Sequence, residues 1–307
     1  MNKEIKKNIY AARCIGNVEP IEYMIPYPSM RSLIEGQNIK YSQQLIIEEP
    51  NLTNFDFYTL VQQTANWLEK KGLKPKERII LPNLSYPQTE ILLYGIWQLG
   101  GIAVLCKNSD KNEISQRVKA STIINNQIDL HQTIKKFPKV YNPKYKPLLD
   151  DEALITFEKK NGIKLSHYNL LVNAYGIQKL IGIKSRTRYY CNLSPGSAIW
   201  AVFKVILPIF CGCIFDSKDP ELTIGEIGCD YTLRSDLENI EKFSDNDIAI
   251  CTENTAALTI GRKTLHLSQF FKRDNLIDLT GHSVTIGYTD DSLNELRFIN
   301  GRLTIPV

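Results

Sequence analysis

Apolar helices and short apolar strands alternate through the first two thirds of the chain. Apolar residues at helical spacing predict helices over 57–71, 87–99, 166–181 and 198–210. Short apolar runs predict strands over 78–82, 102–106, 153–157, 189–193 and 213–215. Another helix–strand cycle is expected over 110–126, and an irregular, lysine- and proline-containing connection over 131–149.

The pattern changes after residue 218. Residues 230–243 are charged and weakly helical, and 284–286, 295–299 and 303–307 read as short strands between turns. The sequence therefore predicts an α/β protein with a mostly parallel sheet covered by helices on both faces. It also predicts a shortened second α/β unit and a small β-rich C-terminal end.

Three segments follow from this pattern. Residues 1–31 are expected to form an N-terminal extension and 32–216 a first α/β subdomain. Residues 217–307 are expected to form a reduced second subdomain with the β-rich end.

Charge and cysteine content narrow the classes of function. The net charge is +4, from 37 basic and 33 acidic residues that are spread along the chain, which argues against a nucleic-acid partner. Seven cysteines, an odd number, and a charged N-terminus predict reduced thiols and a cytoplasmic protein. Cys211 and Cys213 lack a second pair, so no metal site is expected. Lys204 and Pro208 interrupt the longest apolar stretch, so no membrane contact is expected either.

Several sequence blocks occur in an order that resembles a known superfamily. The blocks begin at Phe57, Gly72, Leu99, Asp150, Leu165, Asn192 and Leu207. Together they resemble the large domain of the adenylate-forming (AMP-dependent synthetase, acyl-CoA synthetase-like) enzymes, in a truncated and degenerate version. The resemblance covers roughly residues 32–216 and implies that superfamily's fold.

Members of that superfamily join a carboxylate to AMP from ATP, usually before the acyl group passes to a thiol. Their phosphate loop resembles Thr-Ser-Gly-Thr-Thr-Gly-Lys-Pro-Lys-Gly and lies between a strand and a helix. Glycines let backbone N–H groups approach the phosphates, hydroxyls add donors, and a lysine offsets the charge.

The matching stretch of this chain, residues 157–165, has lost the tip of that loop. Aligned backwards from Ser166, Gly162 matches the final glycine, and the residues before it match the Lys-Pro-Lys segment: Lys159, Lys160 and Asn161. Glu158 stands where the hydroxyl-rich tip would be. Either Lys159, Lys160 and Lys164 still attract an anion, or the stretch is a short polar turn between a strand and a helix, which is the favoured interpretation. No catalytic residue is predicted.

Other parts of the expected site are equally reduced. Thr252 and Glu253 match the Tyr-Gly-x-Thr-Glu motif, in which the threonine contacts the adenylate and the glutamate helps to hold magnesium. A polar turn is the alternative for these two residues. His167 is expected either to support residues of the site without contacting the ligand itself, or to cap the helix. Residues 290–302 resemble either the β-hairpin that closes the large domain, which is the favoured interpretation, or a compressed block before the hinge. In the second case, His282 would stand in the place of a ribose-binding aspartate.

The resemblance implies an AMP-dependent ligase-like protein, and the damaged loop predicts a pseudoenzyme with a ligand-binding or regulatory role. ATP or AMP with magnesium is expected only if residual binding survives. The chain is expected to stop before the C-terminal catalytic domain and its lysine. Two alternatives remain open: a protein-interaction module that reuses the fold, and a ligase completed by a separate chain. A homodimer or a complex with a partner ligase chain is expected, through apolar helices over 87–99 or 198–210.

Overall fold

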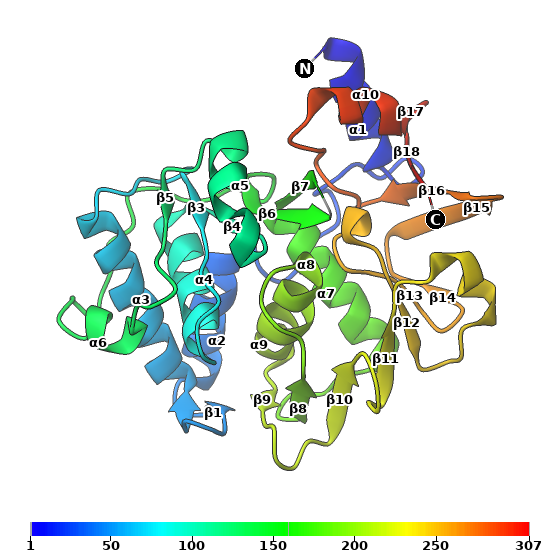
Figure 1. Ribbon diagram of the computed structural model, residues 1–307. Coiled ribbons are helices and arrows are strands. Elements are labelled where there is room, and N and C mark those ends of the chain that lie inside the picture. The colour runs from blue at the N-terminus through cyan, green and yellow to red at the C-terminus, as the bar shows by residue number, and fades with distance from the viewer. Residues whose placement is uncertain (1, 159, 307) are drawn as a thin grey trace.

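The computed structural model describes residues 2–158 and 160–306. Sheets and helices alternate in layers, and a small C-terminal sheet lies beside the main body (Figure 1). The helices are α1 Lys3–Ala12, α2 Met30–Tyr41, α3 Asn54–Lys70, α4 Gln88–Leu99, η1 Asn108–Asp110, α5 Lys111–Val118, α6 Leu130–Ile134, α7 His167–Ile181, α8 Ala198–Trp200, η2 Ala201–Ile206, α9 Leu207–Cys211, η3 Leu237–Lys242, η4 Thr252–Asn254 and α10 Asp291–Arg297. Most of the predicted helices in the first two thirds are present.

The first sheet has the strand order β5-β3-β4-β6-β7. Its strands are β3 Arg78–Ile80, β4 Ile102–Leu105, β5 Thr122–Ile123, β6 Glu152–Glu158 and β7 Asn161–Ser166. All pairs are parallel except β6 with β7. Alternate side chains of β4 enter two separate apolar clusters: Ala103 and Leu105 join the main core, whereas Ile102 and Val104 pack with Ile114 of α5. Helices therefore cover both faces, as the sequence predicts.

The second sheet has the order β14-β13-β12-β11-β10-β8-β9-β1-β2. Its strands are β1 Leu45–Ile47, β2 Leu52–Thr53, β8 Arg188–Cys191, β9 Ile214–Phe215, β10 Leu222–Gly225, β11 Tyr231–Arg234, β12 Asp247–Ile250, β13 Ala257–Ile260 and β14 Lys263–Thr264. The central pairs from β1 to β12 are parallel, and antiparallel hairpins close both ends. Residue 216 lies between β9 and β10, so strands from both expected subdomains share this sheet.

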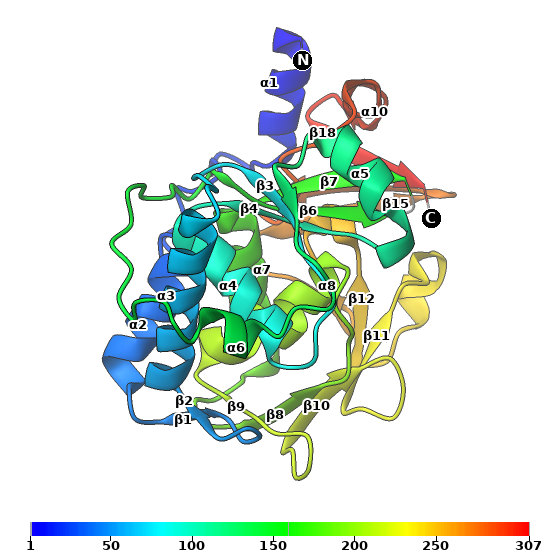
Figure 2. The ribbon, with the colours of Figure 1, turned by 60° about the vertical axis from the view of Figure 1, so that its left-hand side comes forward.

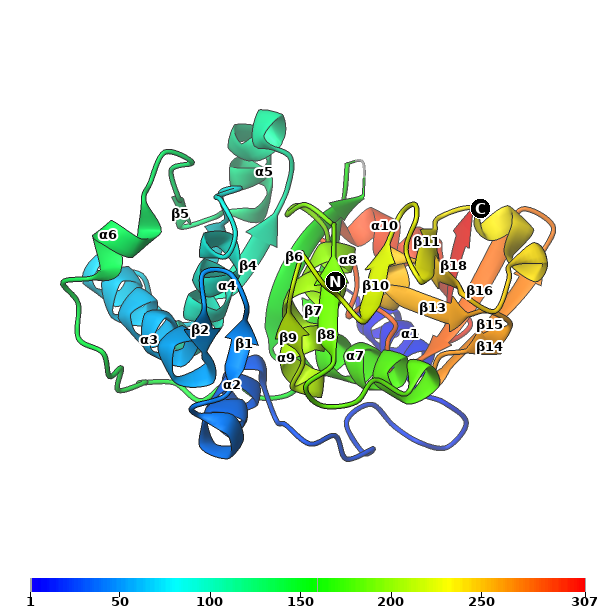
Figure 3. The same cartoon turned by 90° about the horizontal axis from the view of Figure 1, so that it is seen from below.

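Helix α7 lies between the two sheets. It contacts β6 and β7 of the first sheet and β13 of the second, and it packs on η2 and α9 (Figure 3). Ser166 caps its N-terminus, since the side chain accepts a hydrogen bond from Asn169 N, while Asn169 accepts from Ser166 N. The predicted cap at Ser166 is confirmed.

The C-terminal sheet is antiparallel, and the N-terminal helix of the chain packs against it. Its strands, in the order β15-β16-β18-β17, are β15 Ser268–Arg273, β16 Leu276–Gly281, β17 Phe298–Ile299 and β18 Arg302–Pro306. Helix α1 packs on β16, β17 and β18 with Ile5, Ile9 and Ala12 buried (Figure 2). Ordered structure thus begins well before residue 32, where the sequence predicts it to start.

The chain after residue 218 departs most from the sequence-based predictions. Residues 284–286 are not a strand, and most of 295–299 belongs to α10, which Asp290 caps through Ser292 N. Strand β11 occupies part of the segment 230–243 that was expected to be helical. These short segments carry little periodicity of their own, and pairing with distant strands decides their conformation.

The two apolar helices expected to mediate association are covered by the chain itself. Helix α4 packs against α2 and α3, and its Trp97 is fully buried. The continuous helix from α8 to α9, with Trp200 also fully buried, packs against α7 and α2. The expectation of an uncovered apolar face at these helices is therefore wrong. Within the described ranges, no helix has the length and apolar content to cross a membrane.

Candidate functional site

A cleft of about 430 Å³ opens where the second sheet meets the β6–β7 hairpin and the C-terminal sheet. Its lining comes from seven separate stretches of the chain: Asn161, Ile199, Ser235, Asp236, Leu237, Glu238, Ile250, Cys251, Thr252, Glu253, Tyr288, Arg297, Ile305 and Pro306. Ser235 directly follows β11, and Cys251 directly follows β12, two parallel neighbours. The cleft thus lies at the carboxyl ends of parallel strands, the usual position for ligands in open α/β sheets.

Thr252 and Glu253 sit in the tight turn after β12. Thr252 is buried, and its carbonyl accepts a hydrogen bond from Thr255 N at 3.0 Å. Asn173 of α7 fixes the turn, because its Nδ2 donates hydrogen bonds to Asn254 O and to Ala257 O at 3.0 Å each. Thr255 has φ 72°, which is strained for a β-branched residue, and its hydroxyl donates to Ser283 O at 2.7 Å. The turn is therefore held rigidly on both sides.

The β6–β7 hairpin occupies the position of the expected phosphate loop. Glu158 ends β6, Asn161 begins β7, and these two residues pair. Lys159 lies outside the described residues. Lys160 is exposed, and its carbonyl accepts from Arg117 Nη2 at 2.7 Å. The expected turn between a strand and a helix is corrected to a hairpin whose second strand precedes α7.

Gly162 has a packing role in this hairpin. A Cβ at this position would lie 2.4 Å from Thr289 Oγ1, so only glycine lets the segment 286–289 approach β7. That segment pairs with β7 through Lys164 N to Gly287 O at 2.9 Å and Thr289 N to Gly162 O at 2.7 Å. Of the loop remnant residues, Asn161 lines the cleft, whereas Lys160, Gly162 and Lys164 do not.

His167 is a buried residue at the start of α7. Its Nδ1 accepts a hydrogen bond from Met30 N at 3.3 Å. Burial lowers the pKa of His167 to about 4, so the ring is neutral near pH 7. His167 therefore joins α7 to α2 and does not line the cleft.

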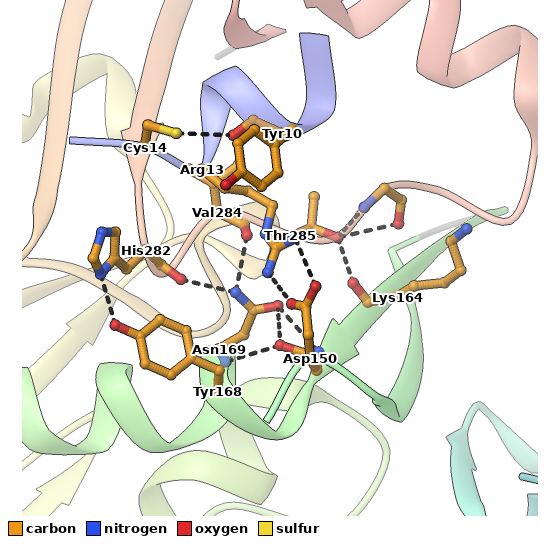
Figure 4. Close-up of polar contacts among 12 residues, drawn as sticks. Tyr10, Arg13, Cys14, Asp150, Lys164, Tyr168, Asn169, His282, Val284 and Thr285 are labelled. Carbon is orange, nitrogen blue, oxygen red and sulfur yellow. Dashed lines mark hydrogen bonds and ion pairs between the residues drawn. The ribbon is translucent and has the colours of Figure 1, made fainter. Parts of the chain in front are cut away.

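A buried polar network ties the start of α7 to the segment around residue 283 (Figure 4). Asn169 Nδ2 donates to His282 O at 2.8 Å and to Val284 O at 3.0 Å. His282 Nδ1 lies 2.7 Å from Tyr168 Oη, and Thr285 Oγ1 donates to Lys164 O at 2.6 Å. Burial lowers the pKa of His282. His282, which would replace a ribose-binding aspartate in the alternative alignment, is thus part of the core.

Solved structures with this arrangement are numerous, and the similarity lies in the fold. The N-terminal subdomain of NpsA from Klebsiella oxytoca, solved with 3-hydroxyanthranilyl-AMSN, superposes with TM-score 0.73 and 14% identity over 91% of this chain and 95% of that one. The chain has the fold of the adenylate-forming enzymes. The anthranilate CoA ligase AuaEII, solved with anthranoyl-AMP, gives TM-score 0.70 at 13% identity over 92% of this chain and 74% of its own.

A third solved structure with the adenylate-forming fold is an o-succinylbenzoate CoA synthetase. This protein, MenE from Bacillus subtilis, matches with TM-score 0.71 and 15% identity over 91% of this chain and 75% of its own. Neither a protein-family model nor a curated protein matches the sequence. The sequence-based prediction of the adenylate-forming fold is confirmed.

Several lining residues had no signal in the sequence. Arg297 comes from α10, Tyr288 from the segment beside β7, and Asp236 from the turn between β11 and η3. Arg297 is half-buried and, within residues 2–158 and 160–306, forms no ion pair. Recognition of β11 as a strand would have placed Asp236 at the carboxyl edge. Nothing local marks Arg297, which reaches the cleft through tertiary packing.

The cleft offers hydrogen-bonding and charged groups of both signs. Thr252 and Asn161 carry neutral polar groups, Arg297 is a cation, and Glu253 is a carboxylate that also accepts a weak hydrogen bond from Cys251 Sγ at 3.8 Å. In the described part of the chain, no group of His, Cys, Asp and Glu side chains forms a ready metal cage. A magnesium ion would therefore need oxygen atoms from a bound phosphate as well as from Glu253.

Proposed function

We propose that this chain is a ligase-like protein that binds an adenosine monophosphate-type ligand but has little or no adenylating activity. The observation that carries the proposal is the pairing of Glu158 with Asn161 beside the cleft that Thr252 and Glu253 line. The cleft retains Thr252 and Glu253, the two residues with counterparts in the nucleotide motif of the superfamily. A regulatory or ligand-sensing role follows from binding without turnover.

The loss of activity follows from the missing donors. A triphosphate needs several backbone N–H groups and a cation around its β- and γ-phosphates. Only two residues lie between Glu158 and Asn161, so the hairpin has no room for the glycine- and hydroxyl-rich tip. A monophosphate needs fewer partners, and Arg297 supplies a half-buried cation in the cleft.

The bound molecules of the structural neighbours support the same class of ligand. NpsA and AuaEII were solved with an acyl-AMSN and an acyl-AMP, respectively. The cleft volume of about 430 Å³ falls within the range of small-molecule sites.

Calorimetric titration with AMP and with ATP, each with magnesium, tests the proposal. We expect saturable AMP binding, weakened about tenfold by Arg297→Met and less by Thr252→Val. Arg262→Met is the matched control, since Arg262 is exposed and outside the cleft. Absence of AMP binding would refute the ligand, whereas pyrophosphate release above background with a carboxylate panel would refute the loss of activity.

A further inference from the structure

A second hollow lies on another side of the helix that contributes Ile199 to the cleft. It measures about 330 Å³ and is lined by Glu49, Tyr86, Tyr190, Lys204, Phe215 and Asp216, together with Ser217. None of these residues lines the cleft at Thr252. A smaller cavity of about 20 Å³ shares Tyr86, Lys204 and Phe215 with it and reaches Glu90 of α4.

Aromatic rings surround the mouth of this hollow. Tyr86 and Phe215 lie with centroids 4.7 Å apart and planes inclined by 32°, and Tyr190 lies 5.7 Å from Phe215. Lys204 Nζ is 5.3 Å from the centroid of Tyr86 and 5.7 Å from that of Phe215. Flat aromatic faces of this kind pack well against a planar ligand.

Lys204 supplies the available positive charge. Its ammonium group donates to Leu193 O at 3.0 Å, which leaves further N–H donors for a ligand. The carboxylates at the mouth are matched elsewhere, since Glu49 pairs with Lys218 and Asp216 pairs with Arg188. An incoming carboxylate would therefore meet the cation Lys204, which also interacts electrostatically with Glu90.

Glu90 lies beneath Lys204 and is almost completely buried, with 5% of its surface exposed. In the described part of the chain, neither Glu90 Oε2 nor Trp200 Nε1 has a hydrogen-bond partner. Burial raises the pKa of Glu90 to about 7, and a backbone hydrogen bond and the positive charge of Lys204 oppose that rise. Besides Glu90 and Lys204, the described residues that line this inner cavity include one titratable group, Tyr86, whose pKa is raised by burial and which therefore stays neutral.

We propose that Tyr86, Phe215 and Lys204 form a binding site for a small planar carboxylate, separate from the cleft at Thr252. The carboxylate accepts hydrogen bonds from Lys204, and its ring packs against Tyr86, Tyr190 and Phe215. Glu90 sets the charge of the site. When Glu90 is protonated, Lys204 is uncompensated and the carboxylate binds more tightly; when Glu90 is ionised, the two groups offset one another.

Fluorine NMR of 4-fluorobenzoate with the wild-type protein is the first test. We expect saturable line broadening below about 10 mM ligand, with 4-fluorobenzyl alcohol, which lacks the charge, binding at least about fivefold more weakly. Saturating AMP should leave the signal of bound fluorobenzoate unchanged. Absence of saturation, equal binding of the alcohol, or displacement by AMP would each overturn the separate carboxylate site, and none of these results depends on a variant that must fold.

Two substitutions then test the assigned roles. Lys204→Met should weaken fluorobenzoate binding about tenfold, whereas Lys146→Met, at an exposed position that lines neither hollow, should leave it unchanged. In wild-type protein, affinity should rise several-fold from pH 8 to pH 6, and Glu90→Gln should abolish that dependence. Wild-type binding by folded Lys204→Met, or an unaltered pH profile in Glu90→Gln, would overturn the proposal.

Discussion

Glu158 and Asn161 pair across the β6–β7 hairpin, at the position where an adenylate-forming enzyme would carry its phosphate loop. In place of a loop whose backbone N–H groups could bind phosphate, this chain has two strands that pair with each other up to these residues. Asn161 nevertheless lines the same cleft as Thr252. Residues of the hairpin and of the turn after β12 therefore share one cleft, while the hydroxyl-rich loop that the resemblance implies is replaced by two paired strands.

Lengthening this hairpin should restore affinity for ATP. We expect insertion of Ser-Gly-Thr-Thr-Gly after Glu158 to tighten ATP–magnesium binding several-fold, because the insertion adds backbone and hydroxyl donors near Asn161. Calorimetry would measure the change. An alanine insertion of the same length is the control, and equal affinity in the two insertions would show that the added donors are not used.

Removal of the Asn169 amide should destabilise the fold strongly. Asn169→Leu leaves two buried carbonyl groups, His282 O and Val284 O, without a donor and disrupts the cap at Ser166. We expect the free energy of unfolding to fall by about 3 kcal/mol in urea titrations. Asn142→Leu, at an exposed position, should change it by less than about 0.5 kcal/mol. Similar losses in the two variants would contradict this account.

Two buried groups should give stability pH dependences of opposite sign. The pKa of His167 is lowered from 6.5 to about 4, so its stabilising contribution is complete above pH 6.5 and is lost as the pH falls toward 4. The pKa of Glu90 is raised from 4.5 to about 7, so its contribution is complete below pH 4.5 and is lost as the pH rises through 7. Between pH 4.5 and 6.5 the two effects oppose one another.

Urea unfolding between pH 5 and pH 8 would separate these contributions. Glu90→Gln should leave a stability that rises more steeply with pH than that of wild type. His167→Gln should shift the slope the other way, with each full contribution worth roughly 3 kcal/mol. Parallel profiles for all three proteins would show that neither group titrates with a shifted pKa.

Association with a second copy or with a partner ligase chain stays a prediction. The helices first expected to mediate it, α4 and the segment from α8 to α9, are buried within the chain. We expect association, if driven by apolar contact, to use other surfaces. Light scattering at tens of micromolar protein gives the molar mass directly, and a monodisperse monomer would remove the prediction of a homodimer.

The regular part of the fold was predictable because its elements repeat a strong local pattern. Residues 54–105 alternate an amphipathic helix, α3, and an almost wholly buried one, α4, with buried strands, so burial and secondary structure agree at each step. Helix α7 was equally predictable, since Ser166 supplies a cap and Gly182 takes the left-handed conformation at the other end. In the terminal segments, the local pattern of apolar residues does not predict the observed elements. Helix α1, for example, is placed by its packing on β18.

The sequence by itself determined the adenylate-forming fold of the central body and the loss of the hydroxyl-rich loop. Both features depend on the spacing and type of residues that are close together in the chain. Tertiary structure decided which remnants share a site. Asn161, Thr252 and Arg297 lie in three distant segments, and they meet only because β11 and β12 end beside the hairpin and α10 packs nearby. The same holds for Lys204 and Glu90, whose proximity comes from the packing of two helices. Contacts between distant segments depend on sheet order and packing, which local periodicity does not encode.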